Sequence, residues 1–398
     1  MVLDDKAPII DTDEEFVEKT DFSGELPFTF EVKYTDKETF QLEIHNDDEV
    51  IIVDAEDIVY GRDKATAKDT LEFHFPDFDT YISAIFEENI MEGYWHVNYK
   101  QGYTIPFKAT HGQIHRFSTL KKQPTADLSG KWQVAFEAGT EDEYPAIGEF
   151  EQEGNHLTGT FLTETGDYRY LEGTVQENKF WLSTFDASHA FLFEGKILDD
   201  GSLIGSFRSG KHYTSTWTAT KNPDAQLGDA FELTTSTLGN QPLDFTFQDL
   251  DGNNVSLSDD KYDDKLKLVK ITGTWCPNCK DETYFLKDYF KNNPTDDIEV
   301  IEVAFERYRD TDKAKEILKR YKKKLDIPFD ILYGGYANKT ETSEKFPQIT
   351  RVLSYPTLIF VDKDNMIRDI YTGFSGPATS EFPKFKEKFD KIIAEMRA

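Results

Sequence analysis

Cysteine is nearly absent from this sequence, which has two among 398 residues, Cys276 and Cys279. Two cysteines cannot build the disulfide framework of a small secreted domain. One Cys-x-x-Cys pair also supplies only two of the four ligands of a structural zinc site. The last of the eight histidines is His212, far from the pair in sequence. We therefore expect no metal site.

Long hydrophobic runs are also missing. No apolar stretch has the length needed to span a bilayer, so we expect no transmembrane segment in this chain. Met1-Val2-Leu3 leads into Asp4-Asp5-Lys6 instead of the apolar region of a secretory signal. A lipid anchor upstream of this sequence is left open.

Basic residues are scarce in the first part of the chain. Residues 1–240 carry 19 Lys and Arg against 46 Asp and Glu, a balance of −27, whereas residues 241–398 carry 26 against 29, a balance of −3. The two balances add up to the net charge of −30. Such an acidic surface repels phosphate backbones, and no nucleic-acid-binding motif is present, so nucleic acid is not an expected partner.

The chain is long enough for two or three domains, each with its own core. The pattern of the sequence predicts a multidomain protein with a β-rich N-terminal region of barrel or sandwich modules, followed by an α/β domain. We expect five segments: an acidic tail over 1–24, a β-rich module over 25–120, a β-meander or barrel over 128–222, a linker over 223–240, and the α/β domain over 241–398.

The β-rich assignment rests on alternation of apolar and polar residues with period two. Eight short strands are expected within 128–222, and their separators, such as "EGN" and "DDGS", are rich in residues that tolerate a positive φ. A meander of this kind closes into a barrel or forms a sandwich. The pattern of apolar and polar residues changes near residue 225. "KLVKITGT" (267–274) is a nearly continuous apolar run that is typical of a buried strand, and the residues after it predict helices alternating with strands.

The cysteines lie where that buried strand ends and a helix begins. Pro277 suits the first helical turn, where a missing N–H costs nothing. Cys276 therefore faces the unpaired N–H groups of the helix start, which stabilise a thiolate and favour Cys276 as the nucleophile. Cys279, one turn further on, is within bonding reach but shielded, as a resolving thiol should be. Trp275 flanks the pair and supports this interpretation.

The stretch from about residue 240 onward resembles the TlpA/ResA-like thiol:disulfide oxidoreductases of the thioredoxin superfamily, which are related to the AhpC/TSA redoxins. The resemblance is carried by the hairpin "LDFTFQDLDGNNVSLSD", by "WCPNC" between strand and helix, by "SYPT" (354–357), and by the final hairpin and helix. It covers about 160 residues. The β-rich N-terminal region resembles Bacteroidetes envelope proteins in architecture only.

The resemblance implies roles for several further residues. Pro356 matches the cis-proline that packs beside the dithiol, between Tyr355 and Thr357. In the family fold the backbone of Tyr355 pairs with a substrate strand. Glu282 lies on the same helical face as Cys279, and the family pattern has a Glu at this position. There, partly desolvated and with a raised pKa, it would accept the proton of Cys279.

Two residues bear on how the dithiol is tuned. Lys270 departs from the thioredoxin pattern, which has a buried carboxylate at this position. We expect its stem to snorkel to the surface, with pairing to Glu282 as the alternative. Asn278 is neutral, whereas a His between the cysteines would stabilise the reduced thiolate, so a reductase is favoured.

The sequence thus predicts a thiol–disulfide oxidoreductase that uses no cofactor other than its redox-active disulfide and exchanges electrons with protein disulfides and an upstream thiol donor. Its predicted location is the periplasm or outer envelope, with the cytoplasm as the alternative. One rival is a thiol peroxidase, which is disfavoured because Gly273 stands where a peroxidase needs Thr or Ser. Another is a ligand-binding or partner-binding β protein with an accessory redox domain, in which "FDASHAFLF" (185–193) lines a barrel.

Overall fold

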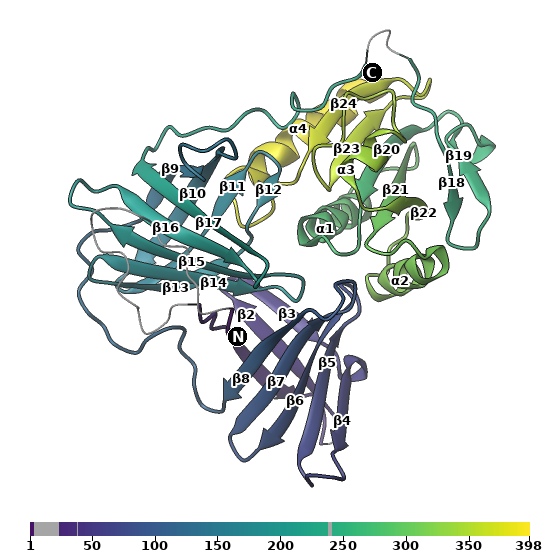
Figure 1. The fold of residues 1–398 in the computed structure, drawn as a ribbon. Helices are drawn as coiled ribbons and strands as arrows, with labels where there is room; N and C mark the ends of the chain where they lie inside the picture. The colour runs from purple at the N-terminus through teal and green to yellow at the C-terminus, as the bar shows by residue number, and fades with distance from the viewer. Residues whose placement is uncertain (4–23, 38, 238–240) are drawn as a thin grey trace. The chain divides into compact units, whose positions relative to one another are not determined.

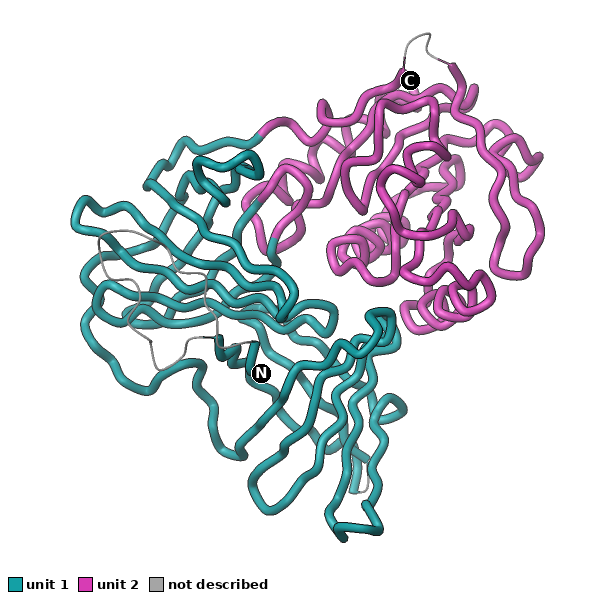
Figure 2. The backbone as a smooth tube through the Cα atoms, viewed as in Figure 1, with its two compact units in different colours: residues 1–162, 168–227 teal, residues 163–167, 228–398 magenta. Residues whose placement is uncertain are grey.

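The computed structural model describes residues 1–3, 24–37, 39–237 and 241–398, which form two compact units (Figure 2). Unit 1 comprises Met1–Leu162 and Tyr168–Leu227, and unit 2 comprises Thr163–Asp167 and Gly228–Ala398. Most of the predicted acidic tail, residues 4–23, lies outside the described residues. Met1 and Leu3 are buried in unit 1, so the first residues of the chain belong to its core.

The first β module of unit 1 consists of two antiparallel sheets (Figure 1). The smaller sheet has the order β1-β2-β3 and the larger one is the meander β4-β5-β6-β7-β8. The alternating burial along β5 and β6 matches the alternation in sequence, because successive side chains of a strand point to opposite faces. The elements are β1 (Thr29–Tyr34), β2 (Phe40–Asn46), β3 (Glu49–Val53), η1 (Ala55–Asp57), β4 (Ile58–Arg62), β5 (Asp69–Phe75), β6 (Thr80–Glu87), β7 (Ile90–Val97) and β8 (Thr104–Thr110).

The second β module is the predicted barrel. Its strands follow the order β10-β9-β17-β16-β15-β14-β13-β11, and pairing of β10 with β11 closes the ring. Closure leaves no free sheet edge, which explains why a meander of short strands is stable here. The strands are β9 (Gly130–Phe136), β10 (Tyr144–Glu153), β11 (His156–Thr163), β13 (Leu171–Gln176), β14 (Lys179–Phe185), β15 (Ala190–Ile197), β16 (Leu203–Ser209) and β17 (Tyr213–Lys221); the short β12 (Gly166–Asp167) follows β11 in sequence.

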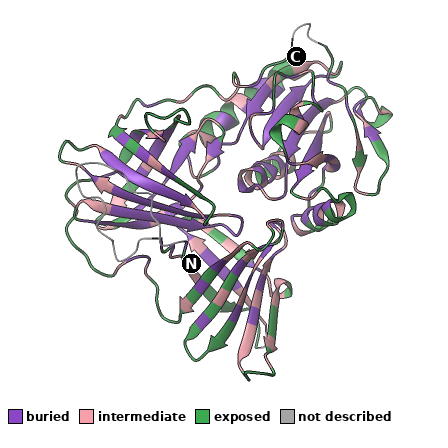
Figure 3. Ribbon diagram, viewed as in Figure 1, coloured by how far each residue is buried: buried purple, intermediate pink, exposed green. Residues whose placement is uncertain are grey.

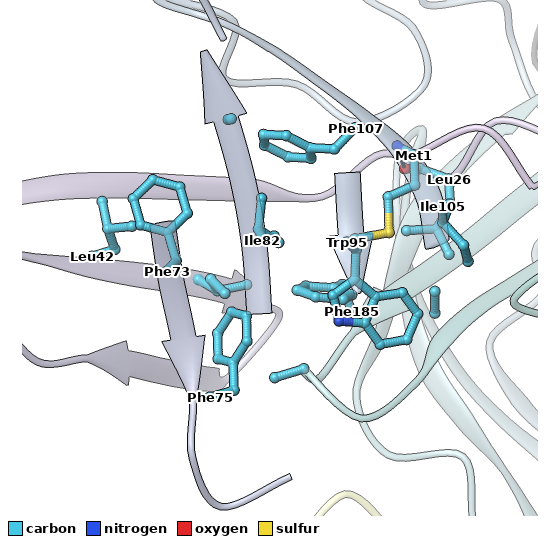
Figure 4. Close-up of a cluster of buried hydrophobic side chains, with 14 of the residues drawn as sticks. Met1, Leu26, Leu42, Phe73, Phe75, Ile82, Trp95, Ile105, Phe107 and Phe185 are labelled. Atoms are coloured by element: carbon cyan, nitrogen blue, oxygen red, sulfur yellow. Dashed lines mark hydrogen bonds between the residues drawn. The ribbon is translucent and has the colours of Figure 1, made fainter. Parts of the chain in front are cut away.

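Aromatic side chains build both cores of unit 1. Phe161, Phe193 and Phe207 pack against one another in the barrel core, with the rings of Phe161 and Phe193 stacked at 4.4 Å. A second cluster joins the two β modules, since Phe185 of β14 packs among residues of the first module such as Trp95 (Figure 4). The segment 185–193 is therefore divided between two packed cores.

Unit 2 is the predicted α/β domain (Figure 1). Its mixed sheet has the order β19-β18-β22-β21-β20-β23-β24, with β20 parallel to β21 and antiparallel to β23. The prediction of an α/β domain after the β-rich region is thereby confirmed. The elements are β18 (Thr246–Asp249), β19 (Asn254–Ser256), η2 (Asp260–Tyr262), β20 (Leu266–Thr272), α1 (Pro277–Asn292), β21 (Ile298–Glu306), α2 (Thr311–Lys324), β22 (Asp330–Tyr336), α3 (Lys339–Ser343), β23 (Thr357–Val361), β24 (Ile367–Thr372) and α4 (Phe382–Arg397).

Both faces of the central strands of unit 2 are covered, and Figure 3 shows β20 and β23 buried along their length. Side chains of α1, α2 and α4 pack together on one face, and Leu243, Tyr262 and Phe346 pack on the other. This burial explains the continuous apolar run of the β20 sequence. Within the described residues, no helix combines the length and the apolarity that crossing a membrane requires.

Part of the predicted linker over 223–240 is structured in unit 2. Phe231 packs against Tyr371 with ring centroids 4.7 Å apart, and Ser236 forms a bridge with Ile349. The change from unit 1 to unit 2 falls between Leu227 and Gly228. The Pro, Gly and Asp residues of this stretch suggested a linker, but Ala230 and Phe231 are partly buried against the core of unit 2.

Candidate active site

The two cysteines lie at the junction of β20 and α1, as predicted, and form a disulfide. Cys276 is the N-cap of α1 and Pro277 occupies the first turn. The backbone N–H of Cys279 donates to Cys276 Sγ over 3.2 Å. A sulfur that accepts an N–H from the helix start is well placed to carry negative charge, because that hydrogen bond favours the thiolate over the thiol.

The two sulfurs differ in accessibility. Cys276 retains 6% of its surface exposure and Cys279 retains none. Trp275 is fixed beside Cys276, because its Nε1 donates to the Phe305 carbonyl over 2.9 Å and the Arg307 guanidinium lies 3.8 Å above its ring. A reagent from solvent therefore reaches Cys276 first, and the division between nucleophile and resolving thiol stays a prediction.

The Tyr355–Pro356 peptide bond is cis, as the resemblance implies. Cys276 Sγ lies 3.4 Å from the Tyr355 carbonyl oxygen, so the loop before β23 borders the disulfide directly. Thr357 begins β23 and its hydroxyl donates to the Ser354 carbonyl over 2.8 Å, which holds the loop in place.

Glu282 lies one turn after Cys279 in α1 and is fully buried. Neither of its carboxylate oxygens has a hydrogen-bond partner among the described residues. Burial raises the pKa of Glu282 to about 8, although the positive charge of Lys270 acts in the opposite direction. Sequence reasoning predicted a partly desolvated Glu282 with a raised pKa, and the structure places its side chain in a fully buried position.

The prediction that Lys270 snorkels to the surface is wrong. Lys270 is fully buried, and its ammonium group lies 3.1 Å from Glu302 Oε1. The same group donates to the Cys279 carbonyl over 2.8 Å and to the Thr283 hydroxyl. Lys270 and Glu302 are direct neighbours across the parallel strands β20 and β21. The lysine is buried because a carboxylate on the adjacent strand compensates for its charge.

This buried pair leads to a stability prediction. Replacing Lys270 by methionine is expected to destabilise unit 2 by about 3–5 kcal/mol, because Glu302 would remain buried without a counter-charge. Lys267→Met in the same strand is the matched control, since its amine donates to the backbone carbonyls of Asp362 and Lys363. Denaturant unfolding followed by circular dichroism measures the difference. A loss for Lys270→Met no larger than for Lys267→Met would contradict it.

Sequence reasoning missed two glutamates in β21. Glu302 pairs with Lys270, and Glu306 accepts hydrogen bonds from the Thr274 hydroxyl at 2.8 Å and the Thr274 N–H at 3.0 Å. Glu306 thereby fixes the residue before Trp275. A signal was available, because Glu299, Glu302 and Glu306 interrupt an otherwise apolar strand next to a strand that contains two lysines. Charges of opposite sign in neighbouring buried strands usually compensate each other.

Asn278, the residue between Pro277 and Cys279, has a structural partner that sequence reasoning did not foresee. Its Nδ2 donates to the Phe374 carbonyl over 3.3 Å and to the Asp167 carbonyl over 3.2 Å. Both acceptors belong to unit 2. Asn278 therefore connects the start of α1 to two other chain segments.

Residues 238–370, within unit 2, match the model of the AhpC/TSA family. Among curated proteins, the thioredoxin-like protein YneN of Bacillus subtilis is 27% identical over 135 residues, which are 34% of this chain and 71% of that protein. The thiol-disulfide oxidoreductase ResA of Bacillus thuringiensis is 25% identical over 132 residues, 33% of this chain. This chain spans 66% of the length of that relative, just under two thirds.

Solved structures similar to this chain include a thiol-disulfide oxidoreductase from Bacteroides fragilis, with 20% identity and a TM-score of 0.27 over 36% of this chain and 96% of that one. A thiol:disulfide interchange protein from Chlorobium tepidum matches with 16% identity and a TM-score of 0.29 over 41% of this chain and all of that one.

Proposed function

We propose that the protein reduces disulfides of envelope proteins through Cys276 and Cys279, because residues 238–370 match the AhpC/TSA family model and unit 2 is similar in sequence to the thioredoxin-like protein YneN and the thiol-disulfide oxidoreductase ResA. The observation that carries the proposal is the position of Cys276, which caps α1, accepts the N–H of Cys279 and is the more accessible of the two sulfurs.

The first step is attack of the Cys276 thiolate on one sulfur of a substrate disulfide. A bond forms between Cys276 Sγ and that sulfur, the substrate S–S bond breaks, and the leaving thiolate takes a proton from solvent. Tyr355 and the cis Pro356 border Cys276, so the backbone of Tyr355 is positioned to pair with the substrate chain during this step.

The second step is attack of the Cys279 thiolate on Cys276 Sγ. This closes the Cys276–Cys279 disulfide and releases the second substrate thiolate, so that two electrons have passed to the substrate. Cys279 must first lose its proton, and Glu282 on the same face of α1 is the proposed acceptor. Because burial raises the pKa of Glu282 to about 8, only the minority of molecules with an ionised Glu282 can accept this proton near neutral pH. In these molecules the transfer costs little free energy, since a free thiol has a pKa of about 8.5.

A dithiol donor has to reduce the disulfide again, because each turnover leaves Cys276 and Cys279 oxidised. Such a dedicated donor is needed where the surroundings are oxidising, and we therefore place the protein in the periplasm or outer envelope. No cofactor besides the disulfide enters this reaction, and the partners are a protein disulfide and the thiol donor.

The reduction potential of the Cys276–Cys279 couple tests the direction of electron flow. The protein is equilibrated in glutathione and dithiothreitol buffers, and the reduced fraction is followed by Trp275 fluorescence and by alkylation. We expect a potential at or below about −220 mV, as for reductases. A potential near −120 mV, about that of a strong oxidant, would contradict the reductase assignment, and absence of a reversible couple would contradict the redox function altogether.

Thiol peroxidase activity is the second candidate, favoured by the match to the AhpC/TSA model. The surroundings of Gly273 argue against it. A Cβ at this position would lie 2.4 Å from Trp275 Nε1 and 2.7 Å from the Phe305 carbonyl oxygen. A Thr or Ser that holds peroxide does not fit there. Consumption of hydrogen peroxide by the reduced protein, at a rate comparable with that of disulfide reduction, would restore this candidate.

A further inference from the structure

Five residues of unit 2, Thr163–Asp167, lie far from the rest of that unit in the sequence. They follow residues of unit 1, and Figure 2 shows them in the colour of unit 2. The segment carries none of the residues that the dithiol mechanism uses. Its contacts nevertheless fall on the loops that surround the disulfide.

Three hydrogen bonds hold the segment there. Asn278, between the cysteines, donates to the Asp167 carbonyl over 3.2 Å. Ser354, next to Tyr355, donates its hydroxyl to the Thr165 carbonyl over 2.9 Å. The backbone N–H of Gly376 donates to the Asp167 carboxylate over 2.6 Å. The start of α1, the cis-proline loop and the loop after β24 are thus all joined to one short segment.

Two glycines permit this close approach. A Cβ on Gly373 would lie 2.6 Å from the backbone carbonyl of Thr165, and a Cβ on Gly166 would lie 2.4 Å from Asn278 Nδ2. Both glycines have a positive φ, 78° and 142°, which side chains disfavour. A side chain at Gly373 would collide with backbone, which cannot rotate away. The contact therefore requires glycine at this position of the loop after β24.

We propose that Thr163–Asp167 forms a steric wall beside the start of α1 and the cis-proline loop, and that this wall slows the reaction of Cys276 with disulfides embedded in polypeptides relative to small disulfides. The inference rests on the proposed function and extends it to a substrate class. The carbonyl of Thr165 accepts the hydrogen bond of the Ser354 hydroxyl. Ser354 directly precedes Tyr355, whose backbone is the proposed pairing site for the substrate chain. A disulfide embedded in a polypeptide has chain on both sides and meets this wall, whereas a small disulfide reaches Cys276 without displacing it.

The wall is tested by deleting Glu164–Gly166 in the full chain. Reduced protein is mixed with an excess of insulin or of glutathione disulfide, and oxidation of the dithiol is followed by Trp275 fluorescence. Each disulfide gives a second-order rate constant. The ratio of the insulin constant to the glutathione constant is expected to rise by more than about threefold over that of the wild type. An increase of about threefold or less over the wild-type ratio would overturn the proposal.

Asp167→Ala is a second variant that removes the bond to Gly376 without shortening the chain, and its ratio is expected to rise in the same direction. The matched controls are deletion of Thr140–Asp142 and Asp142→Ala, in the exposed loop between β9 and β10, and these should leave the ratio at the wild-type value. If reduced wild-type protein reacts with neither disulfide, the proposed function fails. If it reacts and the ratios of the segment variants do not rise, only the wall is refuted.

Discussion

Replacing Cys276 by serine is expected to lower the rate of insulin reduction by about three orders of magnitude or more, because the variant lacks the nucleophile. A serine hydroxyl is not ionised near neutral pH and cannot form a mixed disulfide. The substitution exchanges sulfur for a smaller oxygen at a site with 6% exposure, so the fold should persist. The measurement is the initial rate with dithiothreitol as electron donor.

Cys279→Ser is the matched control for the nucleophile variant. It keeps Cys276 and removes the resolving thiol, so the first step should proceed and the second should stop. We expect a stable mixed disulfide between Cys276 and the substrate, detectable by mass spectrometry without reductant. If Cys276→Ser kept more than about a tenth of the wild-type rate, the assignment of the nucleophile would be wrong.

Replacing Glu282 by glutamine is expected to change how stability depends on pH. In the folded protein, burial raises the pKa of Glu282 from 4.5 to about 8. Between these values the folded state keeps the proton while the unfolded state releases it. The free energy of unfolding of the wild type therefore falls as pH rises from about 4.5 to about 8 through this group. Glutamine does not ionise, so the variant lacks this loss.

The expected difference is large. Each unit of pKa difference corresponds to 1.36 kcal/mol, so Glu282→Gln should be more stable than the wild type by up to about 5 kcal/mol above the raised pKa. Near pH 5 the difference should be small. Denaturant unfolding of the oxidised protein, followed by helical circular dichroism, reports on unit 2, because among the described residues every α-helix lies in unit 2.

Asp288→Asn provides the control for this experiment. Asp288 is an exposed residue of the same helix, so its replacement should shift the curve little and leave its shape unchanged. Glu282→Gln should also slow closure of the Cys276–Cys279 disulfide, since Cys279 would lose its proposed proton acceptor. Parallel stability curves for the wild type and Glu282→Gln would refute the buried, protonated state of Glu282.

Local pattern predicted much of the fold. Residues that alternate with period two became the strands of unit 1, and turn residues between them marked the hairpins that close the barrel. The apolar run before Trp275 became β20, and Pro277 marked the first turn of α1. These features are predictable because each depends on neighbours within a few residues. The linker was less predictable, since Phe231 packs against a residue far along the chain, Tyr371.

The sequence by itself determined the reactive dithiol, its position at a strand-to-helix junction and the helical face shared by Cys279 and Glu282, since backbone geometry relates residues this close. Only the tertiary structure decided that Lys270 pairs with Glu302, 32 residues away, and that Asn278 contacts Asp167, 111 residues away. A buried charge or a polar side chain takes the partner that folding brings nearby, and no local pattern specifies that partner.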